Sequence, residues 1–454
     1  MRNPTELDAL YALLSAAAVT ALLTPVTMRI ARAVGAIDEP RERGLSDRPT
    51  PLLGGLAIFA GVLVAGLLWL PGGYGAGVNS EPHLWSGVLI AAALITVVGA
   101  LDDRFDLPPA LKLLGQLLAA VIVVHFGVAV KAITLPFIGK LALPNAGVTN
   151  AGPVLTVIGI VAMMNVVNFS DGVDGLAAGV CAILAAALAV IAFDLNRGQP
   201  GVLAALTAGA ALGFLIYNFP PASSFMGDCG ANLLGLLMGV ITVEAAVKTT
   251  AVVSFVLPLI LLTMPFLDTT FVVLKRLKYR QPIYRPDSEH FHHRMARIGF
   301  SNRRTIAYLY AWTLMLAGLA LALRFVPYSD HHGHLHTGWT LVMIALGLLV
   351  AAASVYLVYV LEILKFRRLD AIRLRRLRPN ASPTEIERHV TRDFETGEFQ
   401  TISAAERPDV PVTGSGVDRG GAEQRVGERQ VDQDRVGADE QRGHTQAPIA
   451  ADGG

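Results

Sequence analysis

Carboxylate side chains lie at the ends of several long apolar segments of this chain. They are Asp102 and Asp103 in VGALDDRF, Asp171 and Asp174 in NVVNFSDGVDGLA, and Asp228 in NFPPASSFMGD. A carboxylate at the edge of a bilayer is costly to desolvate, so such a group usually marks a function. Several carboxylates that converge on one membrane face indicate a cation site or a proton path.

A lysine accompanies the first pair, because Lys112 opens the next apolar segment. Carboxylates with a lysine suit a metal-bound phosphate: the metal neutralises some oxygens, and the ammonium holds another as a point charge. The alternative is that Asp102 and Asp103 are only a charged stop to a membrane helix.

The segment NVVNFSDGVDGLA has a polar residue at every third position: Asn165, Asn168, Asp171 and Asp174. If the segment is helical, these residues form one polar stripe. Gly172 and Gly175 also allow the helix to open into a turn and a ligand to approach the backbone. A plain polar turn between two spans is the alternative, but it does not need repeated amides and carboxylates in such costly surroundings.

Three further segments carry candidate ligand-binding residues. In NFPPASSFMGD, Phe225 can stack on a flat base and Asp228 is a good metal ligand or, alternatively, a helix N-cap. In TPLLGG, which begins at Thr50, backbone donors near a headgroup and a membrane helix with packing glycines are equally good interpretations. The spacing in HFHHR suits zinc poorly, whereas His and Arg donors suit a diphosphate.

These segments must be positioned by membrane helices. The chain has 454 residues, of which 53% are hydrophobic and 16% charged, against roughly a quarter charged in a soluble domain. The composition predicts an all-α polytopic membrane protein, and the net charge of +1 suggests no nucleic-acid partner. The two cysteines make a disulfide framework unexpected.

Counting apolar stretches of about 20 residues predicts about eleven spans. Their approximate centres are Leu22, Gly61, Leu94, Ala120, Gly159, Ala185, Ala208, Leu237, Ile260, Leu316 and Leu348. Residues 131–152 are too polar to span and are predicted to form an external loop with a short hairpin. Residues 1–365 are predicted to be the transmembrane domain and residues 366–454 a cytoplasmic tail, largely disordered, because the apolar periodicity has ended by about Pro379.

Arginine and lysine gather in alternate loops, which sets the orientation by the positive-inside rule. Basic residues fill the first loop from Arg29 to Arg48, are absent between Pro71 and Leu84, and return between Lys275 and Arg304. This pattern predicts an external N-terminus, a cytoplasmic C-terminus and one cytoplasmic face for all the acidic motifs.

Together the motifs resemble the polyprenyl-phosphate N-acetylhexosamine-1-phosphate transferases, from about Arg41 to Thr305. HFHHR is most similar to the undecaprenyl- and decaprenyl-phosphate GlcNAc-1-phosphate transferases. The resemblance implies a bacterial plasma-membrane enzyme that transfers GlcNAc-1-phosphate from UDP-GlcNAc to a polyprenyl phosphate and releases UMP, in the first lipid-linked step of a cell-envelope polysaccharide. Cys229 and Ala231 depart from the family pattern, where hydroxyl residues are usual.

The resemblance, with the residue chemistry above, implies roles for individual side chains. The expected catalytic residues are Asp102, which positions or deprotonates the lipid phosphate, with Asp103, Lys112 and Asp171. Mg²⁺, with Mn²⁺ as an alternative, is expected at Asp228, Asn168 and Asp171. The expected substrate-binding residues are Thr50, Asn165, Asp174, Asn218, Phe225, His290, His292, His293 and Arg294.

Three other functions stay open at this point. The peptidoglycan branch of the family would use UDP-MurNAc-pentapeptide instead, although it more typically carries a consecutive His run. An ion-coupled transporter could use the acids as a proton or cation path, but no internal repeat is visible. A noncatalytic scaffold would not need the intact motif set. Whether the chain forms a homodimer is also open.

Overall fold

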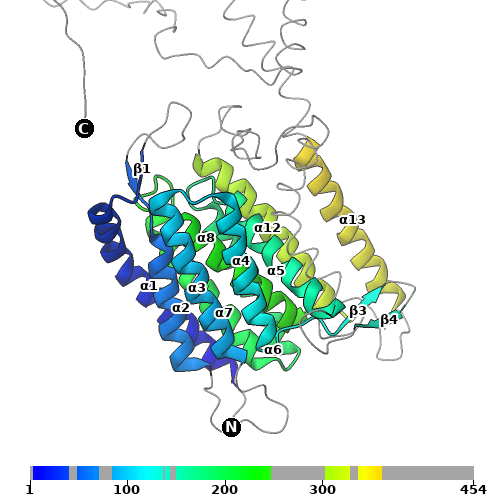
Figure 1. Cartoon of the computed structure of the whole chain (residues 1–454). Helices are drawn as coiled ribbons and strands as arrows, with labels where there is room; N and C mark the ends of the chain where they lie inside the picture. Colours follow the sequence, from blue (N-terminus) through cyan, green and yellow to red (C-terminus); the bar gives the residue numbers. More distant parts are fainter. Residues whose placement is uncertain are drawn as a thin grey trace, which may run out of the picture. The chain divides into compact units, whose positions relative to one another are not determined.

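The computed structural model describes residues 4–39, 49–70, 84–135, 139–143, 150–246, 302–327 and 336–359. Within these ranges the chain is a helical bundle with two small two-stranded sheets (Figure 1). The helices are α1 (Glu6–Val34), α2 (Gly54–Trp69), α3 (Leu84–Phe105), α4 (Pro109–His125), α5 (Ala151–Ser170), α6 (Leu176–Asp194), α7 (Gly198–Asn218), α8 (Gly227–Ile241), α12 (Asn302–Phe325) and α13 (Thr337–Tyr359). The strands are β1 (Ile37–Asp38), β2 (Thr50–Pro51), β3 (Ala132–Leu135) and β4 (Gly139–Ala142).

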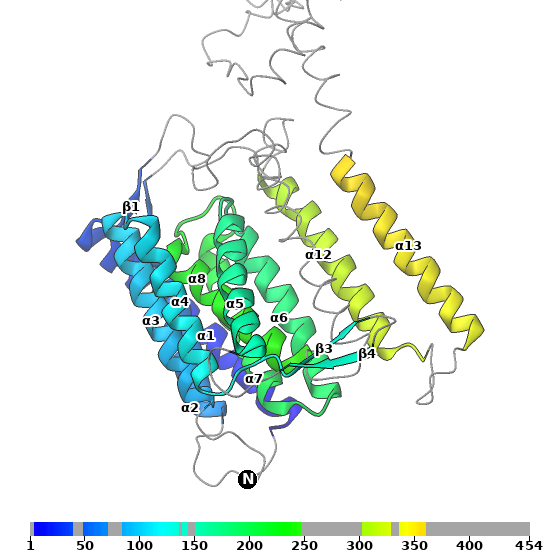
Figure 2. The ribbon, with the colours of Figure 1, turned by 45° about the vertical axis from the view of Figure 1, so that its right-hand side comes forward.

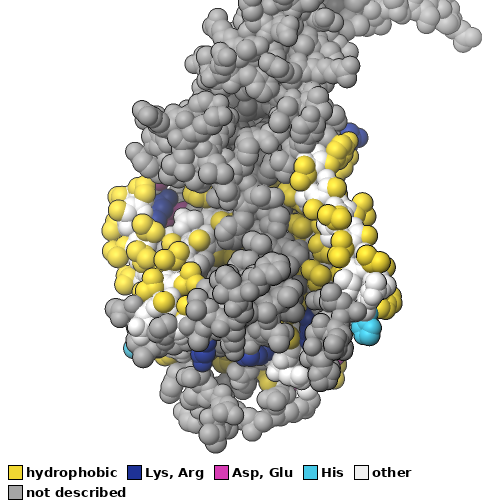
Figure 3. Space-filling view, turned by 90° about the vertical axis from the view of Figure 1, so that its right-hand side faces the viewer, with side chains coloured by type: hydrophobic (Ala, Val, Ile, Leu, Met, Phe, Trp, Pro, Cys, Tyr) yellow, Lys and Arg dark blue, Asp and Glu magenta, His cyan; other side chains and the backbone are white. Residues whose placement is uncertain are grey.

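The described helices have the length and surface of membrane spans. Eight of them are long and apolar enough to cross a bilayer, where α8 is counted together with the π-helical turn η1 (Thr242–Ala246) that continues it, and α2 and α4 are shorter apolar helices. Large hydrophobic side chains point outward, among them Leu22 at 75% and Ile216 at 69% exposed. Figure 3 shows that hydrophobic side chains also cover much of the described surface of one face. Such an apolar surface suits lipid. The helical backbone suits it too, because each helix satisfies its own backbone polar groups.

The predicted fold class is therefore confirmed, whereas the predicted count is not tested. Every predicted span centre but one falls on a described helix. The exception is the span expected near Ile260, which lies outside the described residues.

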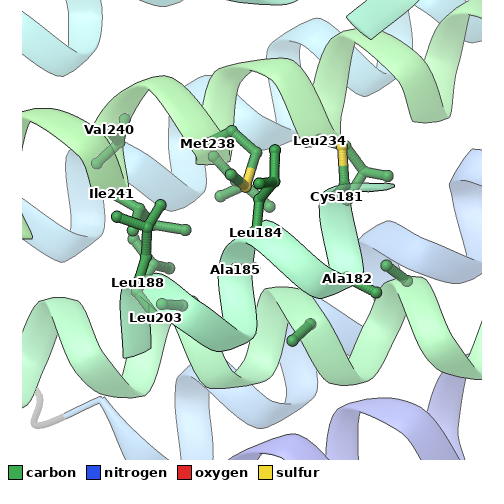
Figure 4. Close-up of a cluster of buried hydrophobic side chains, with 14 of the residues drawn as sticks. Cys181, Ala182, Leu184, Ala185, Leu188, Leu203, Leu234, Met238, Val240 and Ile241 are labelled. Carbon is green, nitrogen blue, oxygen red and sulfur yellow. The ribbon is translucent and has the colours of Figure 1, made fainter. Parts of the chain in front are cut away.

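The interior of the bundle is built around α7 and α8. Apolar side chains of α6, α7 and α8 interlock there, including Leu188, Leu203 and Met238 (Figure 4). Helix α1 packs on α7 at Gly209 and Gly213, where an added Cβ would lie 2.1 Å from the Leu13 carbonyl oxygen and 2.3 Å from that of Ala17. Small residues at this spacing let two membrane helices approach closely.

Two connections between helices bear on the predictions. The loop expected over residues 131–152 contains the predicted hairpin, in which β3 and β4 pair antiparallel. Helix α5 ends at Ser170, and Gly175 takes φ +77° just before α6. The helix therefore opens into a turn, as the glycines allow. A continuous helical stripe is not formed: Asn165 and Asn168 lie on α5, and Asp171 and Asp174 lie beyond it.

Candidate active site

Segments that are distant in sequence meet at the end of the bundle that carries β1 and β2 (Figure 2). Hydrogen bonds and ion pairs join the end of α3 and the start of α4 to the start of α8, and join β2 and the α5–α6 turn to the loop before α8. Every acidic motif noted in the sequence contributes to this end. The acids therefore form one site and are not isolated helix stops.

Lys112 stands at the centre of the site, between two carboxylates. Its Nζ lies 2.6 Å from Oδ2 of Asp102 and 3.3 Å from Oδ2 of Asp228. The Asp102 side chain is only 5% exposed, whereas those of Lys112 and Asp228 are 32% and 25% exposed. Asp102 thus holds the ammonium from the protein side, and Lys112 and Asp228 keep an open side for an anion or a cation.

Asp103 has a different role, because both of its carboxylate oxygens accept hydrogen bonds from backbone N–H groups of α8. The N–H groups of Asp228 and Cys229 donate to Oδ1 and Oδ2 of Asp103 at 2.7 and 3.2 Å. Gly227 permits this approach: its φ is +70°, and a Cβ there would lie 2.3 Å from Asp103 Oδ2. A carboxylate at a helix N-terminus satisfies free N–H groups and the helix dipole. Asp103 therefore positions Asp228.

Asp171 is a further carboxyl group beside this cluster. Burial raises the pKa of Asp171 well above the ordinary carboxyl value, and the charges of Asp228, Asp103 and Asp174 raise it further. The pKa of Asp174 is also raised by burial, against the hydrogen bond that it accepts from the Ala222 N–H. The cluster holds more carboxylate charge than Lys112 can balance, which is the environment that a cation relieves.

A magnesium ion fits this donor set in one particular way. No group of three or more His, Cys, Asp or Glu side chains close enough to cage a metal occurs among the described residues. Mg²⁺ does not need such a cage, because it usually keeps several waters and binds one or two carboxylates together with substrate phosphates. The partly exposed Asp228, the nearby Asp171 and the amide of Asn168 in the last turn of α5 suit that mode.

The loop before α8 is shaped by two residues that the sequence assigned to the substrate. Asn218 accepts from the Gly175 N–H at 2.8 Å and donates to the Ser224 carbonyl at 3.0 Å. Asp174 accepts from the Ala222 N–H at 3.0 Å. Both side chains thus tie the α5–α6 turn to this loop, on which Phe225 is partly exposed.

The TPLLGG segment forms backbone hydrogen bonds with the same loop. The N–H groups of Gly54 and Gly55 donate to the carbonyls of Phe225 and Met226, and the Phe225 N–H donates to Pro51. A Cβ on Gly55 would lie 2.1 Å from the Gly230 nitrogen. Of the two interpretations of this segment, the packing role is the one observed: the backbone donors hold the Phe225 loop, and Thr50 is buried beside them in β2.

Sequence reasoning missed three residues at this end of the bundle. Asn232, one turn after Asp228, bonds Gln116 across the α4–α8 interface. On α12, the Tyr310 hydroxyl donates to the Gly175 carbonyl, and Arg303 Nε donates to the Pro220 carbonyl at 3.1 Å. The four-residue spacing from Asp228 could have flagged Asn232, whereas no local signal distinguishes Tyr310 within its apolar helix. His290, His292, His293 and Arg294 lie outside the described residues.

A bundle of membrane helices with a lysine and clustered carboxylates at one end is the architecture of a polytopic membrane protein with a candidate active site. Residues 85–246 match the family model described as Glycosyl transferase family 4. The chain is 35% identical over 309 residues to the "Probable undecaprenyl-phosphate N-acetylglucosaminyl 1-phosphate transferase" of Bacillus subtilis, covering 67% of this chain and 81% of that protein. It is 34% identical over 345 residues to the "Decaprenyl-phosphate N-acetylglucosaminephosphotransferase" of Mycobacterium leprae, covering 69% and 83%.

A more distant relative is the "Undecaprenyl-phosphate alpha-N-acetylglucosaminyl 1-phosphate transferase" of Salmonella typhi. It is 27% identical over 329 residues, covering 71% of this chain and 86% of that protein. The chain belongs to glycosyl transferase family 4. It is a multi-pass membrane enzyme, as its apolar helices and its relatives agree.

Proposed function

We propose that the chain transfers GlcNAc-1-phosphate from UDP-GlcNAc to a polyprenyl phosphate. An oxygen of the lipid phosphate attacks the phosphorus that carries the sugar. The bond from that phosphorus to the bridging oxygen breaks, and its electron pair leaves with UMP. The observation that carries the proposal is Lys112 held between Asp102 and Asp228 at the end of a membrane bundle, in a chain whose relatives are named for this chemistry.

The main barrier is repulsion between two anions. A phosphate with a second pKa of about 6 is largely ionised near neutral pH, so the nucleophile needs little help from a base. Lys112 would hold one phosphate oxygen, and Asp102 would orient Lys112 and position the lipid phosphate. A divalent cation, Mg²⁺ or Mn²⁺, would offset charge on the diphosphate when held by Asp228, Asp171 and Asn168.

The donor is assigned to the loop before α8 and to the basic HFHHR segment. Phe225 would stack on the uracil, and His290, His292, His293 and Arg294 would meet the diphosphate. Asn218 and Asp174 would act by holding the Phe225 loop in place, because the side chains of both form hydrogen bonds with backbone groups. We place this site at the cytoplasmic face and the N-terminus outside, on the distribution of basic loops.

The test is UMP release by purified protein supplied with UDP-GlcNAc, undecaprenyl or decaprenyl phosphate and Mg²⁺. Release of UMP with formation of a lipid-linked GlcNAc is expected. Turnover with UDP-MurNAc-pentapeptide instead would assign the peptidoglycan branch. Ion-driven uptake into sealed vesicles without UMP release would assign a transporter.

Lys112→Met isolates the central cation, because it keeps the length of the side chain and removes its charge. Activity should fall to near background. The matched control is Lys131→Met, at an exposed lysine beyond the opposite end of α4, which should turn over like the unchanged protein. Full activity in Lys112→Met would refute the proposed role.

A further inference from the structure

A largely buried line of side-chain amides runs inward from the site between three helices. Asn165 on α5 donates to Oε1 of Gln116 on α4 at 2.8 Å, and Gln116 donates to Oδ1 of Asn232 on α8 at 2.8 Å. Asn232 in turn donates to the Asp228 carbonyl at 2.8 Å. Gln116 and Asn232 are 4% and 5% exposed. Buried amides without partners are costly. Gln116 and Asn232 each donate and accept a hydrogen bond, and Asn165 also donates to the Val161 carbonyl of its own helix.

The register of these amides matches that of the catalytic pair. Gln116 follows Lys112 by four residues, about one helical turn, on α4, and Asn232 follows Asp228 by four residues on α8, a spacing of about 6 Å along each axis. The contact between Gln116 and Asn232 thus repeats the contact between Lys112 and Asp228 one turn deeper. Helix α4 packs mainly on α3 and α5 and touches α8 less, so these side chains span the gap between α4 and α8.

The two contacts differ in how firmly they can fix the separation between α4 and α8. The Lys112–Asp228 pair is partly exposed and 3.3 Å long, and an exposed ion pair on a flexible side chain contributes little to holding helices together. The amide pair is buried, short and directional. Within a membrane protein, interhelical hydrogen bonds between such residues fix which faces of two helices meet.

We propose that Gln116, Asn165 and Asn232, the amide network, act as positioning residues that set the distance between Lys112 and Asp228. In this proposal Asn165, which the sequence assigned to the substrate, instead holds Gln116, and the network acts on the substrate only through Lys112 and Asp228. Because the network carries no charge, it holds the helices without competing for phosphate or for a cation. The inference rests on the proposed transferase activity, since turnover is its readout.

The test exchanges the two central amides. Gln116→Asn and Asn232→Gln each change the reach across the gap by one methylene, whereas the double variant restores the summed length. Each single variant should lower kcat by about 10- to 100-fold, as expected for a misplacement of about 1 Å, with an unchanged KM for UDP-GlcNAc. The double variant should recover most of the turnover.

The matched control is Thr207→Val, which removes a buried hydroxyl that donates to the Leu203 carbonyl of its own helix. It should leave kcat unchanged. Asn165→Leu is the second variant if a single amide variant does not fold, and it too should lower kcat. All values are taken per folded, monodisperse protein, so a role in stability alone would not move them.

The outcomes separate this inference from the proposed function. Absence of UMP release in the unchanged protein refutes the proposed function. An active unchanged protein with normal kcat in the amide variants overturns the inference. Slow single variants without recovery in the double variant also overturn it, because the loss would then not arise from the contact between residues 116 and 232.

Discussion

The first turn of α8 and the remainder of that helix lie in opposite environments. At the first turn, Asp228 pairs with Lys112, and Asp103 caps the backbone N–H groups. Further along, Met238 and Ile241 are buried among apolar side chains of α6 and α7 (Figure 4). The apolar half is held by the packing of complementary side chains, and the polar half is held by hydrogen bonds and an ion pair from other helices. A site at a membrane boundary can thus be built by anchoring one end of a helix in a core and capping its other end with partners from distant segments.

The largest expected effect of a substitution in α8 is on kcat, and it distinguishes the first turn of the helix from its apolar remainder. Asp228→Asn should lower kcat by about 100- to 1,000-fold, as loss of one charge-stabilising group in an active site typically does, without unfolding the protein. Ile241→Val is the matched core variant on the same helix. It should cost about 0.5–1.5 kcal/mol of stability and leave kcat unchanged. Steady-state UMP release and thermal unfolding measure both, and activity retained in Asp228→Asn would contradict the assignment.

Chelation tests the metal part of that assignment. We expect turnover to stop when divalent cations are removed by EDTA and to return with Mg²⁺ or Mn²⁺, because Asp228 is a hard oxygen ligand beside a diphosphate site. Undiminished activity in metal-free buffer would rule out a cation at Asp228.

Phe225→Ala tests the exposed part of the loop before α8. The donor should bind more weakly by about 1–3 kcal/mol, the usual range for stacking of a base on an aromatic side chain. Binding of UMP or UDP-GlcNAc by calorimetry measures the change, and Phe219→Ala, another exposed phenylalanine near the loop, is the control. An unchanged donor affinity would remove Phe225 from the nucleotide site.

Asp103 allows positioning to be separated from chemistry. Asp103→Ala removes the acceptor for two N–H groups of α8 and should cost about 0.5–2 kcal/mol of stability, the usual range for a lost helix cap. Asp103→Asn keeps an acceptor and should lose less stability and less activity. Thermal unfolding and kcat of both variants check this. An Asn variant as inactive as the Ala variant but fully stable would show a chemical role for the carboxylate.

The smallest expected effect concerns pH. Because the folded-state pKa of Asp171 is raised, its contribution to stability is full below the ordinary carboxyl pKa and is lost as pH rises through the raised value. In EDTA, the unfolding temperature should therefore fall as pH rises from the ordinary carboxyl pKa to the raised pKa of Asp171. Asp171→Asn should flatten the slope, and so should Mg²⁺, which favours the ionised carboxylate. An equally steep slope in Asp171→Asn would assign the titration to another group.

Sequence patterns predicted the broad features of the molecule because those features are local. Apolar runs of membrane length, the hairpin after α4 and the break at Gly175 follow from composition and backbone preference along one segment. The convergence of the acids at one end followed from alternating loops, since each span reverses the direction of the chain. The sequence therefore predicted which carboxylates lie together, but not the contacts that each of them makes.

The uses of individual polar groups could not be predicted in this way. Asn218 and Asp174 bond backbone groups, Asp103 caps a helix more than a hundred residues away in sequence, and the Gly54 and Gly55 N–H groups hold the Phe225 loop. Each side chain had several chemically reasonable partners, and only the approach of one helix to another selected among them.

The sequence by itself thus determined the class of protein, the family and the set of residues available for chemistry. These depend on residue type, spacing and hydropathy, which the chain carries along its length. The tertiary structure decided which carboxylate meets Lys112, which one caps α8, and how the amides of Gln116 and Asn232 join α4 to α8. The physical reason is that a hydrogen bond or an ion pair needs atoms within about 3 Å, and packing between distant segments sets those distances.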